Sequence, residues 1–136
     1  MHTGWKTQVK QLIAHGEALC RDGRLPDALN CLNSAYDLIP EPKQTSELTR
    51  IVLCNIGELH IRQERPELAF NDFSNAVKCK HGLGNPQIHM RLGQLQYEKG
   101  NMERAKDELM RAYMGAGDAV FEGENPKYLS LIQRFL

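Results

Sequence analysis

Residues 92–112 decide the fold of this chain, and they read LGQLQYEKGNMERAKDELMRA. Gly100-Asn101 interrupts two runs of helical character, as expected for a tight turn between helices. Gly93 and Ala105 stand 12 residues apart, and Ala112 follows 7 residues later. Small residues allow backbones to approach closely. The stretch therefore predicts a helix, a turn and a second helix that touch at these three positions.

The same spacing of small residues occurs twice more. It separates Gly16, Ala28 and Ala35, and again Gly57, Ala69 and Ala76. Repeats of 20 to 50 residues are typical of solenoids, in which stacked helix pairs bury faces that one pair cannot bury alone. At 136 residues the chain is long enough for one such core. We therefore predict a single all-α domain over residues 1–136.

Glycine, proline and capping residues set the predicted helix boundaries. Asp22-Gly23 ends the first helix, and Pro26 opens the second. Thr45 or Ser46 is expected to cap the third helix. Asn85-Pro86 and Asn125-Pro126 each combine a cap with a proline at the first helical position. The predicted helices cover about residues 5–21, 26–39, 48–62, 66–77, a third pair from 86 to about 114, and 127–136.

The three units resemble the tetratricopeptide repeat (TPR), which has large and small residues at fixed offsets. The first unit matches with Leu12, His15-Gly16, Leu19, Ala28, Leu32, Ala35 and Pro40. The second matches with Leu53, Ile56-Gly57, Ala69, Phe73 and Ala76, and has His60 for tyrosine and His81 for proline. The third matches with Leu92-Gly93, Ala105, Leu109 and Ala112, and has His89 at the large position and Gly117 for proline.

The resemblance implies a right-handed TPR α-solenoid of three helix-turn-helix repeats and a C-terminal capping helix. The repeats would span about residues 9–42, 50–83 and 86–119, and the cap about 126–136. The alternative for the last helix is docking on a second copy. Stretches such as LGNPQIHMRLGQ at 83–94 and NPKYL at 125–129 are similar to small stand-alone bacterial TPR proteins, a resemblance that implies no activity.

Composition and charge argue against several classes of function. The 17 basic and 17 acidic residues give a net charge of zero, which disfavours nucleic acid or an anionic membrane as partner. No apolar run has the length of a membrane span, and residues 1–10 lack the apolar core of a secretory signal. The four cysteines form no CxxC pair, and we interpret them as reduced, packed thiols. We therefore expect a cytoplasmic protein.

The sequence contains no motif for catalysis. It has no nucleophile elbow, no glycine-rich phosphate loop and no HExxH pattern. We interpret His15, His60 and His89 as packing residues, with a metal site made by two of them as the alternative. The acidic cluster of Asp118, Glu122 and Glu124 is interpreted as a solvated turn. We thus expect no enzyme activity, no cofactor and no metal.

The resemblance implies that the first helix of each pair lines a concave groove. The residues we expect to bind a peptide there are Ile13, Glu17, Ile51, Asn55, Glu58, Arg62, Gln87, Met90, Arg91, Gln94 and Tyr97. The same pattern also points Lys10, Ala14, Cys20, Arg21, Cys54, Ile61 and Glu98 inward. This mixture of apolar and charged residues suits a peptide with a few apolar anchors.

A chaperone-type carboxylate clamp is disfavoured within this groove. In the clamp that TPR co-chaperones use, Asn55 and Arg91 would match, but Ile13, Glu17 and Gln87 replace the other three residues. Glu17 would also repel a carboxylate.

The leading hypothesis is therefore a scaffold or adaptor that binds a protein or peptide of unknown identity without catalysis. The alternative is a stoichiometric inhibitor, such as an immunity protein for a toxin or a brake on an enzyme. The protein would be a monomer or a weak homodimer.

Overall fold

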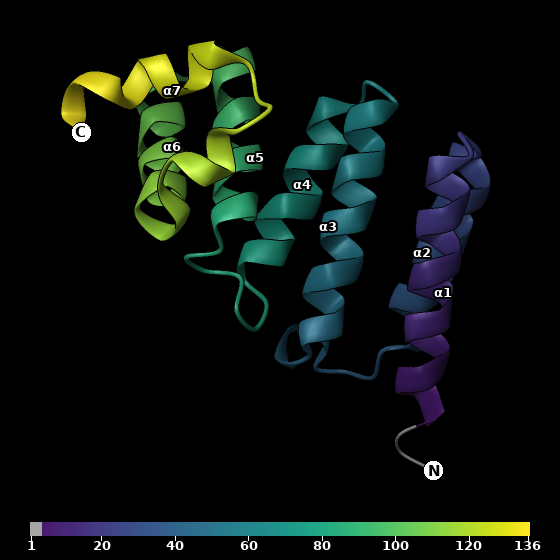
Figure 1. Ribbon diagram of the computed structural model, residues 1–136. Helices are drawn as coiled ribbons and strands as arrows, with labels where there is room; N and C mark the ends of the chain where they lie inside the picture. The colour runs from purple at the N-terminus through teal and green to yellow at the C-terminus, as the bar shows by residue number, and fades with distance from the viewer. Residues whose placement is uncertain (1–3) are drawn as a thin grey trace. The chain divides into compact units, whose positions relative to one another are not determined.

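A computed structural model describes residues 4–136, and these residues form helices and turns with no strand (Figure 1). The α-helices are α1 (Gly4–Arg21), α2 (Leu25–Leu38), α3 (Glu47–Arg62), α4 (Pro66–Val77), α5 (Pro86–Glu98), α6 (Met102–Ala116) and α7 (Pro126–Ile132). Three short 3-10 helices are η1 (Lys43–Thr45), η2 (Gly117–Phe121) and η3 (Gln133–Phe135). The chain divides into an N-terminal unit, residues 1–81, and a C-terminal unit, residues 82–136.

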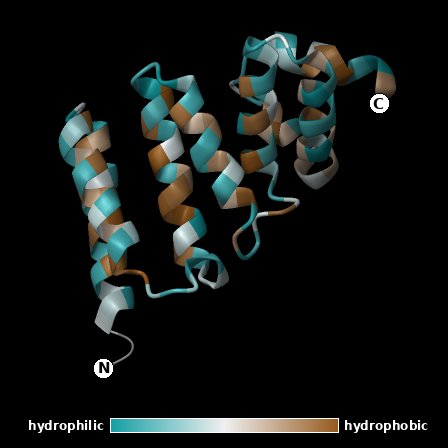
Figure 2. Cartoon of the chain, turned by 180° about the vertical axis from the view of Figure 1, so that it is seen from behind, coloured by the Kyte–Doolittle hydropathy of each residue, from teal (hydrophilic) through white to brown (hydrophobic). Residues whose placement is uncertain are grey.

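Two helix pairs, α1 with α2 and α3 with α4, build the N-terminal unit. Its core is apolar and includes Val9, Leu32, Val52 and Leu59. Apolar and polar residues alternate around each helix in Figure 2, which is the pattern of amphipathic helices that bury one face. The first helices of the two pairs, α1 and α3, also contact each other and run in the same direction (Figure 1).

The pair α5 and α6 forms the C-terminal unit together with η2 and α7. Its core joins Met90 of α5, Leu109 and Ala112 of α6, Phe121 of η2 and Ile132 of α7. Ile132 is completely buried, so the last helix is part of this core. The capping function expected for residues 126–136 remains a prediction, but α7 packs on α6 within its own unit.

The repeat glycines lie where the two helices of a pair touch. A Cβ added at Gly57 would stand 2.6 Å from the Phe73 ring, and one at Gly93 would stand 2.7 Å from the Leu109 side chain. A Cβ at Gly16 would meet Leu32 at 3.1 Å. The close approach predicted from the spacing of small residues is thus present in all three pairs.

The predicted caps and turns are largely confirmed. The side chains of Ser46, Asn85 and Asn125 each accept hydrogen bonds from the first backbone N–H groups of the following helix. Gly23 has a φ of 77°, in the left-handed region that ends a helix. Between α3 and α4, Glu64 takes the same region with a φ of 59°, although glycine is the residue that usually supplies it.

Two predicted boundaries are wrong by a few residues. α6 extends past residue 114 to Ala116 and so includes Gly115, where an added Cβ would stand 2.8 Å from the Pro86 side chain. The last α-helix ends at Ile132 rather than at Leu136, and its final residues tighten into η3. The last turn of a helix is often of the 3-10 type.

Candidate functional site

Two polar contacts connect α1 to α3 at the C-terminal end of both helices. The guanidinium of Arg62 donates from Nη1 to the backbone carbonyl of Cys20 at 2.9 Å. The Asn55 amide nitrogen lies 3.5 Å from Oε2 of Glu17. These contacts bring together groove residues that are 38 to 42 positions apart in the sequence.

A pocket of about 140 Å³ opens between α1 and α3 beside these contacts. Leu32 and Leu59, both buried in the core, supply its apolar floor. Its polar lining consists of four predicted groove residues, Glu17, Asn55, Glu58 and Arg62. Cys20 completes the lining. The pocket therefore combines an apolar floor with amide, carboxylate and guanidinium groups. We call it the α1/α3 pocket.

The apolar groove residues of this unit lie deeper than predicted. Ile13 is only 7% exposed and belongs to the core, and Ile51 packs partly buried against the same core. Ile13 points inward because Val9, Ile13 and Gly16 share one stripe of α1. It therefore offers little surface to a ligand.

A second, wider cleft of about 410 Å³ lies at the N-terminal end of the same two helices. Its lining combines the first turns of α1, the start of α3 and the end of the unit, and consists of Trp5, Lys6, Lys10, Thr45, Ser46, Glu47, Leu48 and Lys80. The repeat pattern pointed to Lys10 alone among these residues. Trp5 and Lys80 were not predicted to bind a ligand because they stand outside the groove positions of the repeats.

The groove face of α5 is in contact with the chain's own C-terminal segment. Nη1 of Arg91 and Nε2 of Gln94 both donate to Oε1 of Glu124, at 3.2 and 2.7 Å. Arg91 also donates to Oε1 of Gln94 at 2.8 Å. Glu124 is half-buried by these contacts, so its interpretation as part of a solvated turn is wrong.

The remaining α5 positions meet the same segment. The rings of Tyr97 and Tyr128 pack edge to face with centroids 5.2 Å apart. Oε2 of Glu98 accepts from Lys127 Nζ at 2.8 Å and from the Tyr128 hydroxyl at 2.7 Å. Met90 is 2% exposed and packs with Phe121 and Ile132, and of the peptide-binding residues predicted on α5 only Gln87 is exposed.

These contacts change the acidity of two groups. Hydrogen bonds from Lys127 and Tyr128 hold the pKa of Glu98 below its ordinary value. Burial, together with the neighbouring Glu98 carboxylate, raises the pKa of Tyr128. Both shifts favour an ionised Glu98 that accepts hydrogen bonds from a neutral tyrosine and a charged lysine.

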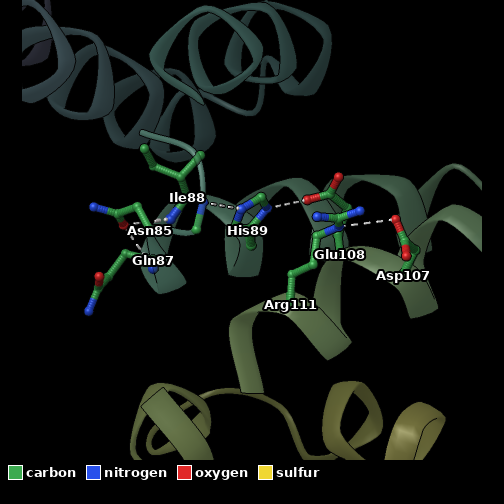
Figure 3. A network of polar contacts seen from close by, with 8 residues as sticks. Asn85, Gln87, Ile88, His89, Asp107, Glu108 and Arg111 are labelled. Carbon is green, nitrogen blue, oxygen red and sulfur yellow. Dashed lines mark hydrogen bonds and ion pairs between the residues drawn. The ribbon is translucent and has the colours of Figure 1, made fainter. Parts of the chain in front are cut away.

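Two of the three histidines pack as predicted, each against an acid of the second helix in its pair. His60 Nδ1 lies 2.6 Å from Oδ2 of Asp72, and His89 Nδ1 lies 2.7 Å from Oε2 of Glu108. Figure 3 shows His89 between Glu108 and the backbone before Asn85, where its Nε2 accepts from the N–H of Gly84 at 2.9 Å. His15 is exposed rather than buried, and its Nδ1 lies 3.7 Å from Sγ of Cys31 on α2.

The described residues offer little for catalysis or metal binding. Between residues 4 and 136, no group of three or more His, Cys, Asp or Glu side chains could hold a metal ion. Burial raises the pKa of Cys54 to about 11, which leaves it mostly protonated and unreactive at neutral pH. Burial also raises the pKa of Asp72, opposed by its hydrogen bond to His60.

No helix in the described part of the chain is both long and apolar enough to span a membrane.

Comparisons with known proteins give matches in structure but not in sequence. No protein-family model matches the chain, and no curated protein matches its sequence. The type III secretion chaperone SycD of Yersinia enterocolitica, solved with a peptide of the translocator YopD, has a TM-score of 0.71 and 15% identity over 92% of this chain and 89% of that chain. The first TPR of Spaghetti (RPAP3), solved with the HSP90 peptide SRMEEVD, has a TM-score of 0.69 and 16% identity over 94% of this chain and 92% of that chain. The chain therefore has the all-α fold of tetratricopeptide repeat proteins.

Proposed function

We propose that this protein is a non-catalytic interaction module that binds a peptide segment of another protein on the α1/α3 face. The observation that carries the proposal is the α1/α3 pocket, where a buried leucine floor is surrounded by polar side chains from two helices. Both similar structures were solved with a peptide, which supports the same class of partner.

The chemistry of the pocket suits an extended peptide. Leu32 and Leu59 close the bottom of the pocket but are 0% and 1% exposed, so an apolar side chain of the peptide would pack mainly on Cys20 and on the aliphatic parts of Glu58 and Arg62. The Asn55 amide can both donate to and accept from a peptide backbone. Glu17 and Arg62 present opposite charges at the exposed rim, which would select the flanking residues.

The predicted binding residues of α5 contribute less directly in this proposal. Arg91 and Gln94 already bind Glu124, and Tyr97 packs on Tyr128, so a partner would have to compete with these contacts. Gln87 remains exposed and can take part. We therefore assign the first contacts with a partner to the N-terminal unit.

The decisive experiment is affinity capture from the native host with mass spectrometry, using a matched pair of variants. The double variant Asn55→Ala with Arg62→Ala should reduce enrichment of the partner about tenfold or more, because it removes two polar groups of the pocket. The control combines Asn33→Ala on α2 with Arg104→Ala on α6, two exposed residues of the same types outside the pocket. Equal capture by both double variants would refute the assignment to this face.

The identity of the captured protein also decides between adaptor and inhibitor. A partner enzyme or toxin that loses activity at a one-to-one ratio would establish the stoichiometric inhibitor. A partner that keeps its activity while bound would establish the adaptor. We propose that the protein is a monomer or weak homodimer and that it is located in the cytoplasm. Sedimentation equilibrium of the purified protein tests the oligomeric state.

A further inference from the structure

The wider cleft of the N-terminal unit has a strong excess of positive charge. Lys6, Lys10 and Lys80 line it, and none of them pairs with a carboxylate of the described residues. Lys6 and Lys10 are one helical turn apart on α1, while Lys80 arrives from the end of the unit. Three ammonium groups around one cleft repel one another, and an anionic ligand would relieve that repulsion. We call this site the basic cleft.

The one acidic residue of the basic cleft is already engaged. Oε1 of Glu47 accepts from Nη2 of Arg50 at 3.1 Å and lies 3.3 Å from Nδ1 of His81. These hydrogen bonds hold the pKa of Glu47 below its ordinary value. Glu47 therefore leaves the three lysines without a neutralising partner.

Two apolar side chains limit what kind of anion fits. Trp5 and Leu48 line the same cleft and are each half-buried, so they leave part of their surface to a ligand. Tryptophan combines a large apolar ring with an N–H donor, which is why it is enriched at protein interfaces. A small inorganic anion would use the lysines but leave this apolar surface uncovered.

The charge changes sign along the same pair of helices. Glu17 and Glu58 line the α1/α3 pocket at the other end, and Glu17 follows Lys10 by seven residues, or about 10 Å of helix. An extended peptide covers that distance with about three residues. A long uniform polyanion such as RNA would meet the carboxylates, whereas a peptide that is acidic at one end only would not.

We propose that the basic cleft binds the acidic end of the partner peptide, whose following residues enter the α1/α3 pocket. The inference rests on the proposed function and adds to it the charge and the direction of the bound segment. Acidic side chains pair with Lys6, Lys10 and Lys80, and an apolar residue about three positions away occupies the α1/α3 pocket.

Trp5 allows a direct test, because it is the single tryptophan of the chain and lines the cleft. Titration with a hexaglutamate peptide should change the Trp5 emission in a saturable way, and a hexaglutamine peptide should not. Lys10→Glu and Lys80→Glu should each raise the Kd for hexaglutamate about tenfold or more. The control Lys78→Glu carries the same charge change on an exposed residue that does not line the cleft, and its Kd should stay within about twofold.

Three outcomes would overturn the inference. The first is an unchanged Trp5 emission on addition of hexaglutamate. The second is an equal loss of affinity in Lys78→Glu, which would indicate a response to net charge. The third is tighter binding of a uridylate hexamer than of hexaglutamate, which would assign the cleft to nucleic acid. Circular dichroism melts confirm that each variant is folded.

The two proposals can fail separately. If partner capture needs Asn55 and Arg62 but hexaglutamate does not bind, only the basic cleft is wrong. If hexaglutamate binds through Lys10 and Lys80 but no partner depends on the α1/α3 pocket, the proposed function is wrong.

Discussion

At the residue scale, the missing Cβ of the repeat glycines is what sets the distance between paired helices. The three sites are not equivalent. The distance from an added Cβ to the nearest atom of the facing helix would be 2.6 Å at Gly57, 2.7 Å at Gly93 and 3.1 Å at Gly16. The neighbour also matters, because Phe73 is a buried rigid ring that cannot turn away.

Replacing Gly57 by alanine should therefore destabilise the protein. Overpacking against Phe73 costs about 1–3 kcal/mol, and the gain in helix propensity returns up to about 1 kcal/mol. The control Gly16→Ala meets Leu32 less closely and should be near neutral. Urea unfolding followed by circular dichroism measures both, and a stability of Gly57→Ala equal to that of Gly16→Ala would contradict the argument.

His89 shows how a departure from the repeat consensus is compensated. The N–H of Gly84 can only donate, so Nε2 of His89 must be the unprotonated nitrogen and Nδ1 must carry the hydrogen toward Glu108. Nitrogen NMR of the histidine ring should show this tautomer at neutral pH.

His89→Ala should cost about 1–3 kcal/mol of stability, because it leaves the Gly84 N–H and the Glu108 carboxylate without this partner. The exposed His15 is the control, and His15→Ala should change stability by less than about 0.5 kcal/mol. Thermal melts of both variants test the difference. A loss in His15→Ala as large as that in His89→Ala would exclude the hydrogen bonds as the cause.

At the scale of elements, α7 is held to α5 by an ionic contact as well as by core packing. Glu98 of α5 accepts hydrogen bonds from Lys127 and Tyr128 of α7, and its pKa lies below the ordinary value of 4.5. A carboxyl with a lowered folded-state pKa stabilises the folded state above its unfolded pKa, and this contribution is lost as the pH falls through the folded value.

The difference in stability between the protein and its Glu98→Gln variant should therefore depend on pH. It should be complete at neutral pH, because Glu98 is ionised in both states, and should be lost as the pH falls below the ordinary value of 4.5 and through the lower folded-state pKa. Urea unfolding at a series of pH values measures it, with Glu103→Gln as a control because Glu103 is exposed on α6. A difference that persists in acid would mean that packing, not the ionised carboxylate, is responsible.

At the scale of the whole molecule, each of the two units has an apolar core of its own. One joins α1, α2 and α3, and the other joins α5, α6, η2 and α7. In repeat proteins the free energy of unfolding is close to the sum of the stabilities of the single repeats and of their interfaces. A destabilising substitution in one repeat therefore lowers the stability of that region most. The single tryptophan, Trp5, reports on the N-terminal unit alone.

Ile132→Ala should lower the stability of the C-terminal unit by about 2–4 kcal/mol, because the side chain is fully buried. Trp5 fluorescence should then show a later unfolding midpoint than circular dichroism, which averages over both units. Phe135→Ala is the control, since Phe135 is 46% exposed and should cost less than about 1 kcal/mol. Coincident midpoints by both probes in Ile132→Ala would show that the units unfold together.

What could be predicted from the sequence alone was local. The 12- and 7-residue spacing, the caps at Ser46, Asn85 and Asn125, and the turn at Gly23 each depend on residues within one helix pair. Such short-range rules follow from the helical repeat and from backbone sterics, so they predicted repeated helix pairs and nearly all helix boundaries, while the family resemblance implied the TPR fold.

The surfaces were decided only by the tertiary structure. Sequence spacing placed Ile13 and Met90 on the groove face, but packing put both into cores. It gave no sign that Glu124 would bind Arg91 and Gln94, or that Lys80 would join Lys6 and Lys10 at one cleft. These contacts join residues about 30 to 70 positions apart. Whether such residues come close depends on the relative orientation of the helices, which the turns and loops determine. Helical periodicity carries no information about that orientation.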